Sequence, residues 1–222
     1  MVKVDWRRRA EIGRERRARN RARILEAARI LLTSGPVALV TVDHVTREAR
    51  LSRGALYSHF RSLDELWAVV AAELASAIRD FIPVSVAAAD PVARIAAGCA
   101  AFIGEAQRDP GWGALFARGV SAFPIVASAA RDWLTTSLQL AKGEGRLTPF
   151  SMEVGFDLIF GAVLEAMRSA SEARLSPRDV PDVVGGILRA LGVHADEVNQ
   201  ALRQLDNGMA PARDARSATR TN

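Results

Sequence analysis

The feature that most constrains this chain is the stretch TVDHVTREARLSRGALYSHFRSLDEL, residues 41–66. Thr41 can cap a first helix whose apolar residues recur at helical spacing through Ala49. Arg50-Leu51-Ser52 then interrupts the pattern, and its serine can cap a second helix that we expect to run to about Phe60. Two helices joined by so short a turn form a helix-turn-helix, a motif whose second helix enters the DNA major groove.

The positive charge of the chain is concentrated around this motif. Residues 1–67 carry 15 Lys and Arg against 8 Asp and Glu, whereas the remaining 155 residues carry 15 against 17. The run from Arg7 to Arg23 alone holds nine arginines and two glutamates. Such a block is either solvated and disordered or in contact with phosphates and the minor groove. Because it directly precedes the helix-turn-helix, we favour contact with DNA.

Composition predicts an all-α fold class. Hydrophobic residues make up 49% of the chain and aromatic residues 6%, and alternating β-branched runs are few. No apolar segment follows the N-terminal arginines and no uncharged run is long enough to span a membrane, so we expect neither a secretory signal nor a membrane partner. The single cysteine, Cys99, excludes an intrachain disulfide and fits a buried apolar role in a reducing cytoplasm.

Glycine, proline and helix-capping residues predict where the helices of the chain begin and end. Gly35-Pro36 ends the first helix near Ser34, and Ser62-x-x-Glu65 is a capping box for a helix that connects to the rest of the chain. Further helices are expected at 91–108, 124–142, 151–172, 177–191 and 195–205, with a shorter helix or a loop at 111–123. The expected domains are a flexible basic arm (1–19), a helix-turn-helix domain (20–75), a second helical domain (76–207) and a disordered tail (208–222).

Residues 20–75 resemble the DNA-binding domain of the TetR family of transcriptional repressors. The matching signature is Thr41, Val45, Ala49, Leu51-Ser52, Gly54-Ala55-Leu56-Tyr57, His59-Phe60 and Asp64-Glu65-Leu66. The resemblance implies a homodimer with an N-terminal helix-turn-helix and a C-terminal all-helical domain for ligand binding and dimerisation. In that C-terminal region it is one of layout and helix pattern only.

The resemblance implies a role for each matching position. Thr41 would offer a phosphate its hydroxyl and the N–H groups of a helix start, and Arg53 would read guanine through O6 and N7. Tyr57 and His59 would contact phosphates, although packing or surface exposure explains them as well, and Ala55 could touch a thymine methyl. The complete set of predicted DNA contacts is Thr41, Arg50, Ser52, Arg53, Gly54, Ala55, Tyr57, Ser58, His59 and Arg61.

Two positions depart from the family pattern. Arg50 stands where the family commonly has glycine in the turn, so a positive φ there would strain the backbone. Leu63 stands where the family usually has a phosphate-binding lysine, which removes one charged contact. The basic arm and Arg61 can substitute for that lysine.

Apolar residues of the second half either line a ligand cavity or fill the core. They are Phe102, Trp112, Phe116, Phe123, Trp133, Phe150, Met152 and Phe156. Because few charges interrupt them, the expected effector is mostly apolar or aromatic. Its candidate polar anchors, which surface positions explain equally well, are Glu105, Arg118, Asp157 and Glu165.

The helices at 151–172 and 177–191 are the expected dimer interface. The first of them spreads apolar residues over more than one face, so one face would pack inside and the other against a partner subunit. The predicted interface residues are Phe160, Leu164, Met167, Val184, Ile187 and Leu188.

The sequence does not indicate an enzyme. Its three histidines are scattered, and no HExxH pair, GxSxG elbow, P-loop or GxGxxG is present, so we expect neither a catalytic site nor a metal or cofactor. The prediction is a homodimeric repressor that binds a palindromic double-stranded DNA operator and is released by a small-molecule effector. Two alternatives stay open: a sequence-blind architectural nucleic-acid binder, and an interaction module with weakened DNA binding.

Overall fold

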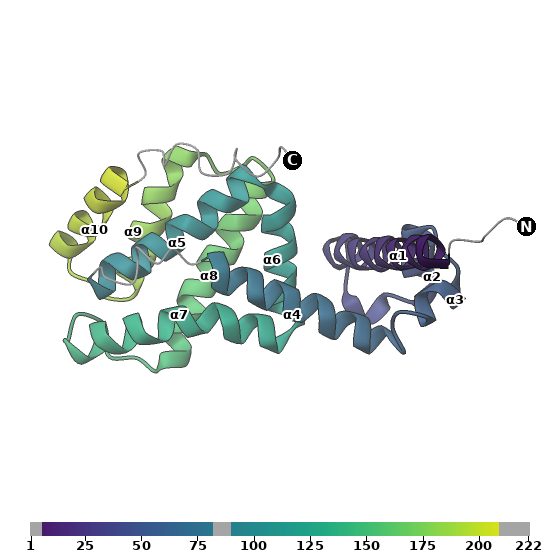
Figure 1. Cartoon of the computed structure of the whole chain (residues 1–222). Coiled ribbons are helices and arrows are strands. Elements are labelled where there is room, and N and C mark those ends of the chain that lie inside the picture. Colours follow the sequence, from purple (N-terminus) through teal and green to yellow (C-terminus); the bar gives the residue numbers. More distant parts are fainter. Residues whose placement is uncertain (1–5, 82–89, 209–222) are drawn as a thin grey trace, which may run out of the picture. The chain divides into compact units, whose positions relative to one another are not determined.

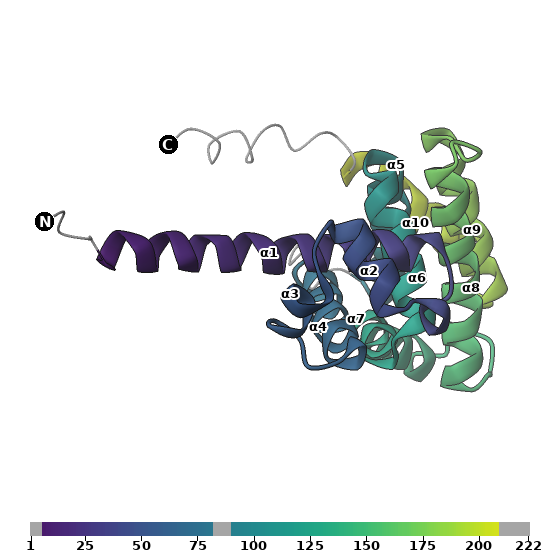
Figure 2. The same cartoon turned by 90° about the vertical axis from the view of Figure 1, so that its right-hand side faces the viewer.

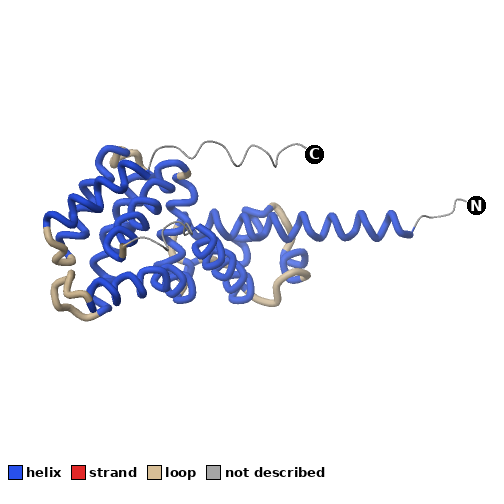
Figure 3. Tube along the Cα trace, turned by 60° about the vertical axis from the view of Figure 1, so that its left-hand side comes forward, coloured by secondary structure: helices blue, strands red, loops and turns tan. Residues whose placement is uncertain are grey.

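The computed structural model describes residues 6–81 and 90–208, and the regular structure of these residues is entirely helical (Figures 1 and 3). The predicted all-α class is therefore confirmed. Contacts divide the chain into two compact units, Met1–Arg79 with Arg118–Ala129, and Asp80–Ala117 with Ala130–Asn222. The predicted disordered tail lies outside the described residues except for Gly208.

The first unit contains the helix-turn-helix. Its elements are α1 (Trp6–Ser34), η1 (Val37–Leu39), α2 (Val42–Ala49), α3 (Arg53–Tyr57) and α4 (Leu63–Phe81), whose last two residues belong to the second unit. Side chains from α1 to α4 meet in a core that excludes solvent, formed by Ile24, Leu32, Val45, Leu56 and Leu66. The segment 118–129 joins this unit through Phe123, whose ring centroid lies 6.1 Å from that of Trp67 on α4. Phe123, a predicted ligand contact, thus packs with α4.

α1 reaches further toward the N-terminus than the sequence prediction. Instead of a flexible arm over residues 1–19, the chain is helical from Trp6 onward and forms one helix of 29 residues (Figure 2). Arginine, glutamate and alanine are good helix formers, and an ion pair between Glu15 and Arg19 links successive turns. These local preferences offset the repulsion among the arginines.

α3 is shorter than the prediction of a helix to about Phe60. It ends at Tyr57, and the Ser58 hydroxyl donates to the carbonyl of Ala55, 2.7 Å away. The N–H of His59 donates to the carbonyl of Leu56, which tightens the last turn. This tighter turn redirects the chain toward α4 and carries Phe60 into the core, where it is 2% exposed.

The second unit is assembled around one helix. Its elements are α5 (Pro91–Arg108), α6 (Pro110–Ala122), α7 (Pro124–Gly143), α8 (Met152–Ser171), η3 (Pro177–Asp179), α9 (Val180–Ala190) and α10 (Ala195–Gly208), with part of α6 and α7 in the first unit. α5 packs against α8, α9 and α10. Asp90 caps α5 by accepting from the N–H groups of Val92 and Ala93, and Pro91 occupies the first turn. The segment left open at 111–123 is helical as far as Ala122.

Arg146 ties the ends of several elements of the second unit together. Its guanidinium pairs with Asp90 before α5, with Glu144 after α7 and with Glu197 on α10. The hydrogen bonds that Arg146 donates to these carboxylates, the one to Asp90 foremost, raise the pKa of Arg146. The ion pairs join residues up to 56 positions apart, so helical periodicity could not reveal them.

No single helix among the described residues is long and apolar enough to cross a membrane. The bent pair of α6 and α7, which meet at 104°, passes the same test of length and composition when taken together. Large side chains of this pair, including Phe116, Leu134 and Leu138, are buried inside the protein.

Candidate DNA-binding surface

Both helices of the helix-turn-helix begin at a side-chain cap. Thr41 Oγ1 accepts from the N–H of His44 at 3.3 Å, and the N–H of Thr41 donates to His44 Nδ1 at the same distance. Ser52 Oγ accepts from the N–H of Ala55 at 3.2 Å and starts α3. The sequence predicted these caps at Thr41 and Ser52, and they fix the residue at which each helix of the motif begins.

Arg50 lies in the turn with a left-handed backbone, at φ 52° and ψ 48°. Its own N–H donates to the carbonyl of Arg47, and the N–H of Leu51 donates to the carbonyl of Thr46, which together close the C-terminus of α2. Arg23 of α1 donates to the carbonyl of Arg50 at 3.2 Å. The turn therefore requires the conformation that favours glycine, as the departure from the family pattern suggested.

Replacing Arg50 with glycine is expected to stabilise the first unit by about 1 kcal/mol, because glycine relieves the left-handed strain. The same change removes a guanidinium and is expected to weaken DNA binding. Urea unfolding and a binding titration measure the two effects. Arg50→Ala is the matched control, since it removes the charge but keeps a side chain on the left-handed backbone. Equal unfolding midpoints for Arg50→Gly and Arg50→Ala would show that the backbone at this position is not strained.

Arg53, the predicted base reader, is held by an acid that the sequence patterns did not single out. Its Nε and Nη2 donate to the two carboxylate oxygens of Asp43 on α2, at 2.7 and 2.6 Å. The hydrogen bond from Arg53 lowers the pKa of Asp43, and the same bond raises the pKa of Arg53. Asp43 uses one edge of the guanidinium, so the other edge, formed by Nη1 and Nη2, can still pair with a guanine.

The remaining predicted contacts of α3 lie at its surface. Tyr57 is 52% exposed, and Gly54 and Ser58 are also exposed. Ala55 is half-buried, and the Ser58 hydroxyl is engaged by a carbonyl within its own turn. The exposed tyrosine contradicts a purely packing role, because its ring is not enclosed by the core.

His59 and Arg61 follow α3 and differ in their surroundings. His59 is half-buried beside Phe60, and burial, with smaller contributions from Arg17 and Arg21, lowers its pKa. This shift favours the neutral imidazole, which can both accept and donate one hydrogen bond. Arg61 has a side chain that is 93% exposed and carries its charge beside the start of α4, where the family lysine is replaced by Leu63.

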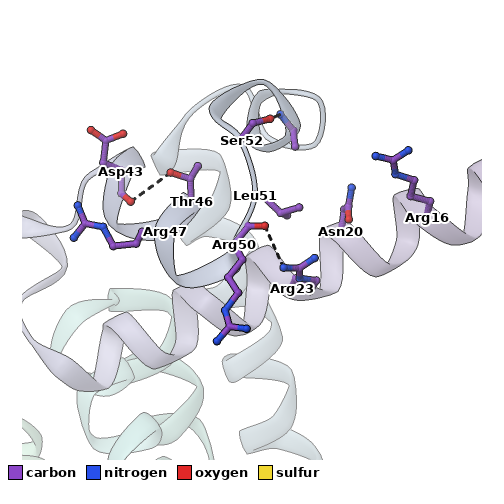
Figure 4. A pocket seen from close by; sticks show the side chains of 10 residues that line it. Arg16, Asn20, Arg23, Asp43, Thr46, Arg47, Arg50, Leu51 and Ser52 are labelled. Atoms are coloured by element: carbon purple, nitrogen blue, oxygen red, sulfur yellow. Dashed lines mark hydrogen bonds between the residues drawn. The ribbon is translucent and has the colours of Figure 1, made fainter.

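A groove runs between α1 and the helix-turn-helix (Figure 4). It is an open hollow of about 820 Å³ lined by Arg16, Asn20, Arg23, Asp43, Thr46, Arg47, Arg50, Leu51, Ser52 and Ala55. Asp43, which is paired with Arg53, is the only acid among these described lining residues. The i, i+4, i+7 spacing of Arg16, Asn20 and Arg23 places them on one helix face, a signal that the expectation of a flexible arm overlooked.

The predicted ligand residues of the second unit form a packed aromatic cluster. The ring centroid of Phe102 lies 4.9 to 6.2 Å from those of Phe116, Trp133 and Trp112. Phe81, at the end of α4, joins them at 5.1 Å from Phe102, and the sequence patterns did not reveal it. The enclosed space beside these rings is only about 10 Å³, so they fill the core in this conformation.

The other candidates for the ligand site lie outside this cluster. Phe156 stacks beneath the guanidinium of Arg131, which lies 5.1 Å from its ring centroid. Of the four candidate anchors, Arg118 and Asp157 are exposed, and Glu105 and Glu165 pair with arginines of their own helices. Phe150 and Met152 are half-buried at the start of α8. Cys99 is buried, and desolvation raises the pKa of its thiol to about 12.

The predicted dimer residues are mostly used by the core of the chain itself. Met167, Val184, Ile187 and Leu188 are at most 4% exposed, because these faces of α8 and α9 pack against α5 and against each other. Phe160 and Leu164 are half-buried. The outward stripe of α8 consists instead of Val154, Leu158 and Gly161.

A capped helix-turn-helix with an exposed second helix and flanking arginines defines the class of DNA-binding transcription regulators. Residues 24–70 match the family model described as bacterial regulatory proteins, tetR family. The helix-turn-helix segment of this chain is thus similar to that of the tetR family. No curated protein matches the sequence.

Solved structures resemble the chain over most of its length. RolR (NCGL1110) in complex with resorcinol is 22% identical, with a TM-score of 0.59 over 85% of this chain and 95% of that one. SmeT, the repressor of the Stenotrophomonas maltophilia multidrug efflux pump SmeDEF, is 20% identical, with a TM-score of 0.57 over 79% and 91%. AibR in complex with isovaleryl coenzyme A and operator DNA is 19% identical, with a TM-score of 0.58 over 78% and 97%. At these identities the likeness shows a shared fold.

Proposed function

We propose that this chain is a ligand-responsive repressor that acts in the cytoplasm and binds a palindromic operator as a homodimer. The observation that carries the proposal is the exposed face of α3, where Arg53 is oriented by Asp43 and flanked by Tyr57. Arg53 would read a guanine, and Tyr57 would contact a phosphate. The capped start of α2 at Thr41 would hold a second phosphate, where the helix dipole favours negative charge.

The dimer would form through the outward faces of α8 and α9. Val154 and Leu158 are 47% and 39% exposed on α8, and Gly161 follows them one turn later on the same stripe. A Cβ atom added at the exposed Gly186 of α9 would meet nothing within 4 Å, so this position also leaves room for a closely packed helix. Apolar and small residues on neighbouring helices are what a four-helix interface requires.

Gly161→Arg is expected to convert the dimer to a monomer at micromolar concentration, because it places a long charged side chain in a close helix contact. Sedimentation or light scattering measures the outcome. Gly143→Arg is the matched control, since Gly143 is also exposed with open space around it but lies at the end of α7. A wild-type chain that is already monomeric at this concentration would exclude the proposed dimer.

The effector would be a small, mostly apolar or aromatic molecule that binds within the aromatic cluster. The resorcinol bound by RolR supports the idea that this fold accommodates a small aromatic ligand, whereas AibR binds the larger isovaleryl coenzyme A. Because Phe81 is the last residue of α4, a ligand that displaces its ring from Phe102 and Trp112 would act on the helix that begins beside the helix-turn-helix. Ligand and operator would then oppose each other by linkage.

Selection of bound sequences from random DNA tests the proposed function. The expected result is a short palindrome whose half-sites are separated by about one helical turn, roughly 34–36 Å, or a multiple of it. Full competition by random DNA would favour a sequence-blind binder instead. An effector that tightens operator binding would contradict release by ligand.

A further inference from the structure

The N-terminal part of α1 extends well past α2 and α3 (Figure 2). The 14 steps from Trp6 to Asn20 correspond to about 21 Å of helix at 1.5 Å per residue. Among the residues of α1 whose burial is described, the hydrophobic core of the first unit uses those from Ile24 onward. The preceding turns therefore contribute little to this core and present a helical surface of their own.

The two glutamates of this extension lie away from one of its helix faces. Arg9, Arg16 and Arg23 recur every seven residues and so share one face, the face that lines the groove at Arg16 and Arg23. Glu11 and Glu15 lie on another face, where Glu15 pairs with Arg19. The arginines that face the groove are thus separated from the glutamates that would neutralise them.

Three contacts hold α1 in place against the residues that flank α3. Arg17 donates to the carbonyl of Ser58 at 3.2 Å, and the guanidinium of Arg21 lies 5.5 Å from the ring centroid of Phe60. Arg23 donates to the carbonyl of Arg50 at 3.2 Å. These contacts fix the position of the groove relative to α3. A DNA strand bound in the groove would therefore have a defined position relative to the bases that α3 reads.

The groove has the chemistry of a polyanion site. Arg16, Arg23, Arg47 and Arg50 line it, and the one acidic residue in its described lining, Asp43, is neutralised by Arg53. Ser52 and Ala55 of the turn and of α3 line the same groove (Figure 4). The groove and the DNA-reading surface of α3 share residues. The polyanion that fits the groove is therefore the same DNA molecule that α3 contacts.

We infer that this groove and the basic face of α1 bind the sugar-phosphate backbone of DNA next to the half-site, beyond the bases that α3 reads. At 3.4 Å of rise per base pair, about 21 Å of helix runs alongside roughly six base pairs. The contacts carry no sequence information but add affinity and salt dependence. This inference rests on the proposed DNA binding and extends it.

The test compares Arg16→Ala, the groove variant, with Arg14→Ala, the control. Each variant removes one charge from the same turn of α1, and alanine preserves the helix. Arg14 lies nearly opposite Arg16 on the helix, so only the groove variant alters the groove face. Salt dependence of binding is measured on a random 30-base-pair duplex and on any selected operator. On both DNA molecules, the groove variant is expected to reduce the magnitude of the slope of log K against log salt by about 1, and the control by less than half as much.

Ethylation interference on the selected operator provides the second readout. Wild type and the control variant are expected to show sensitive phosphates next to the half-site, and the groove variant is expected to lose them. Equal slopes for the two variants, or tighter binding of an RNA duplex of the same length, would overturn the inference. Failure to select an operator would contradict only the proposed repressor function, because the random duplex still reports on the groove.

Discussion

Replacing Arg53 with alanine is expected to weaken operator binding about 10- to 100-fold and to weaken binding to random DNA much less. A bidentate arginine–guanine pair contributes strongly to discrimination between bases. Arg53 has the geometry for such a pair, because Asp43 holds its Nε and Nη2 at 2.7 and 2.6 Å. Fluorescence anisotropy on the selected operator and on a variant lacking the guanine measures the loss.

Asp43→Asn is the informative partner of this substitution. It removes a negative charge near DNA, so binding to random DNA is expected to strengthen, but Arg53 loses its orientation and the preference for guanine is expected to fall. A double variant should then show less than the sum of the two losses of specificity, because both residues act on one contact. Additive losses, or an unchanged preference for guanine in Asp43→Asn, would contradict the orienting role of Asp43.

Phe102→Ala is expected to lower the free energy of unfolding of the second unit by about 3–5 kcal/mol. Phe102 is 4% exposed and lies at the centre of the cluster formed with Phe81, Trp112, Phe116 and Trp133. Its removal leaves a cavity among rings that cannot collapse without losing contact with one another. Differential scanning calorimetry and urea unfolding measure the change.

Phe160→Ala is the matched control for this prediction. Phe160 is half-buried and has one ring neighbour in the described residues, Phe156 at 6.3 Å. Its removal is expected to cost clearly less, because part of the lost side chain was already in contact with water. An equal or smaller loss for Phe102→Ala would show that the cluster is not central to the stability of the unit.

Local features of the helix-turn-helix could be predicted because they depend on neighbouring residues. The caps at Thr41 and Ser52 and the left-handed turn at Arg50 are formed within a few positions of the chain. The helical extension of α1 is equally local, but the density of arginines favoured the expectation of a flexible arm. Helix propensity and the Glu15–Arg19 ion pair outweigh charge repulsion there.

Side-chain partners from distant positions could not be predicted in the same way. Periodicity identified α8 and α9 as two-faced apolar helices, but Met167, Val184, Ile187 and Leu188 face inward, toward a core that exists only once α5 is in place. The spacing of apolar residues shows which of them share a helix face. It does not show which other helix each face packs against.

By itself, the sequence determined the helices, their caps, the strained turn and the concentration of positive charge at the N-terminus, since all of these follow from spacing and composition. Only the tertiary structure decided that Asp43 orients Arg53, that Phe81 completes the aromatic cluster and that the arginines of α1 line a groove beside α3. The physical reason is that each of these contacts depends on how separate helices pack, and packing is set by the whole core.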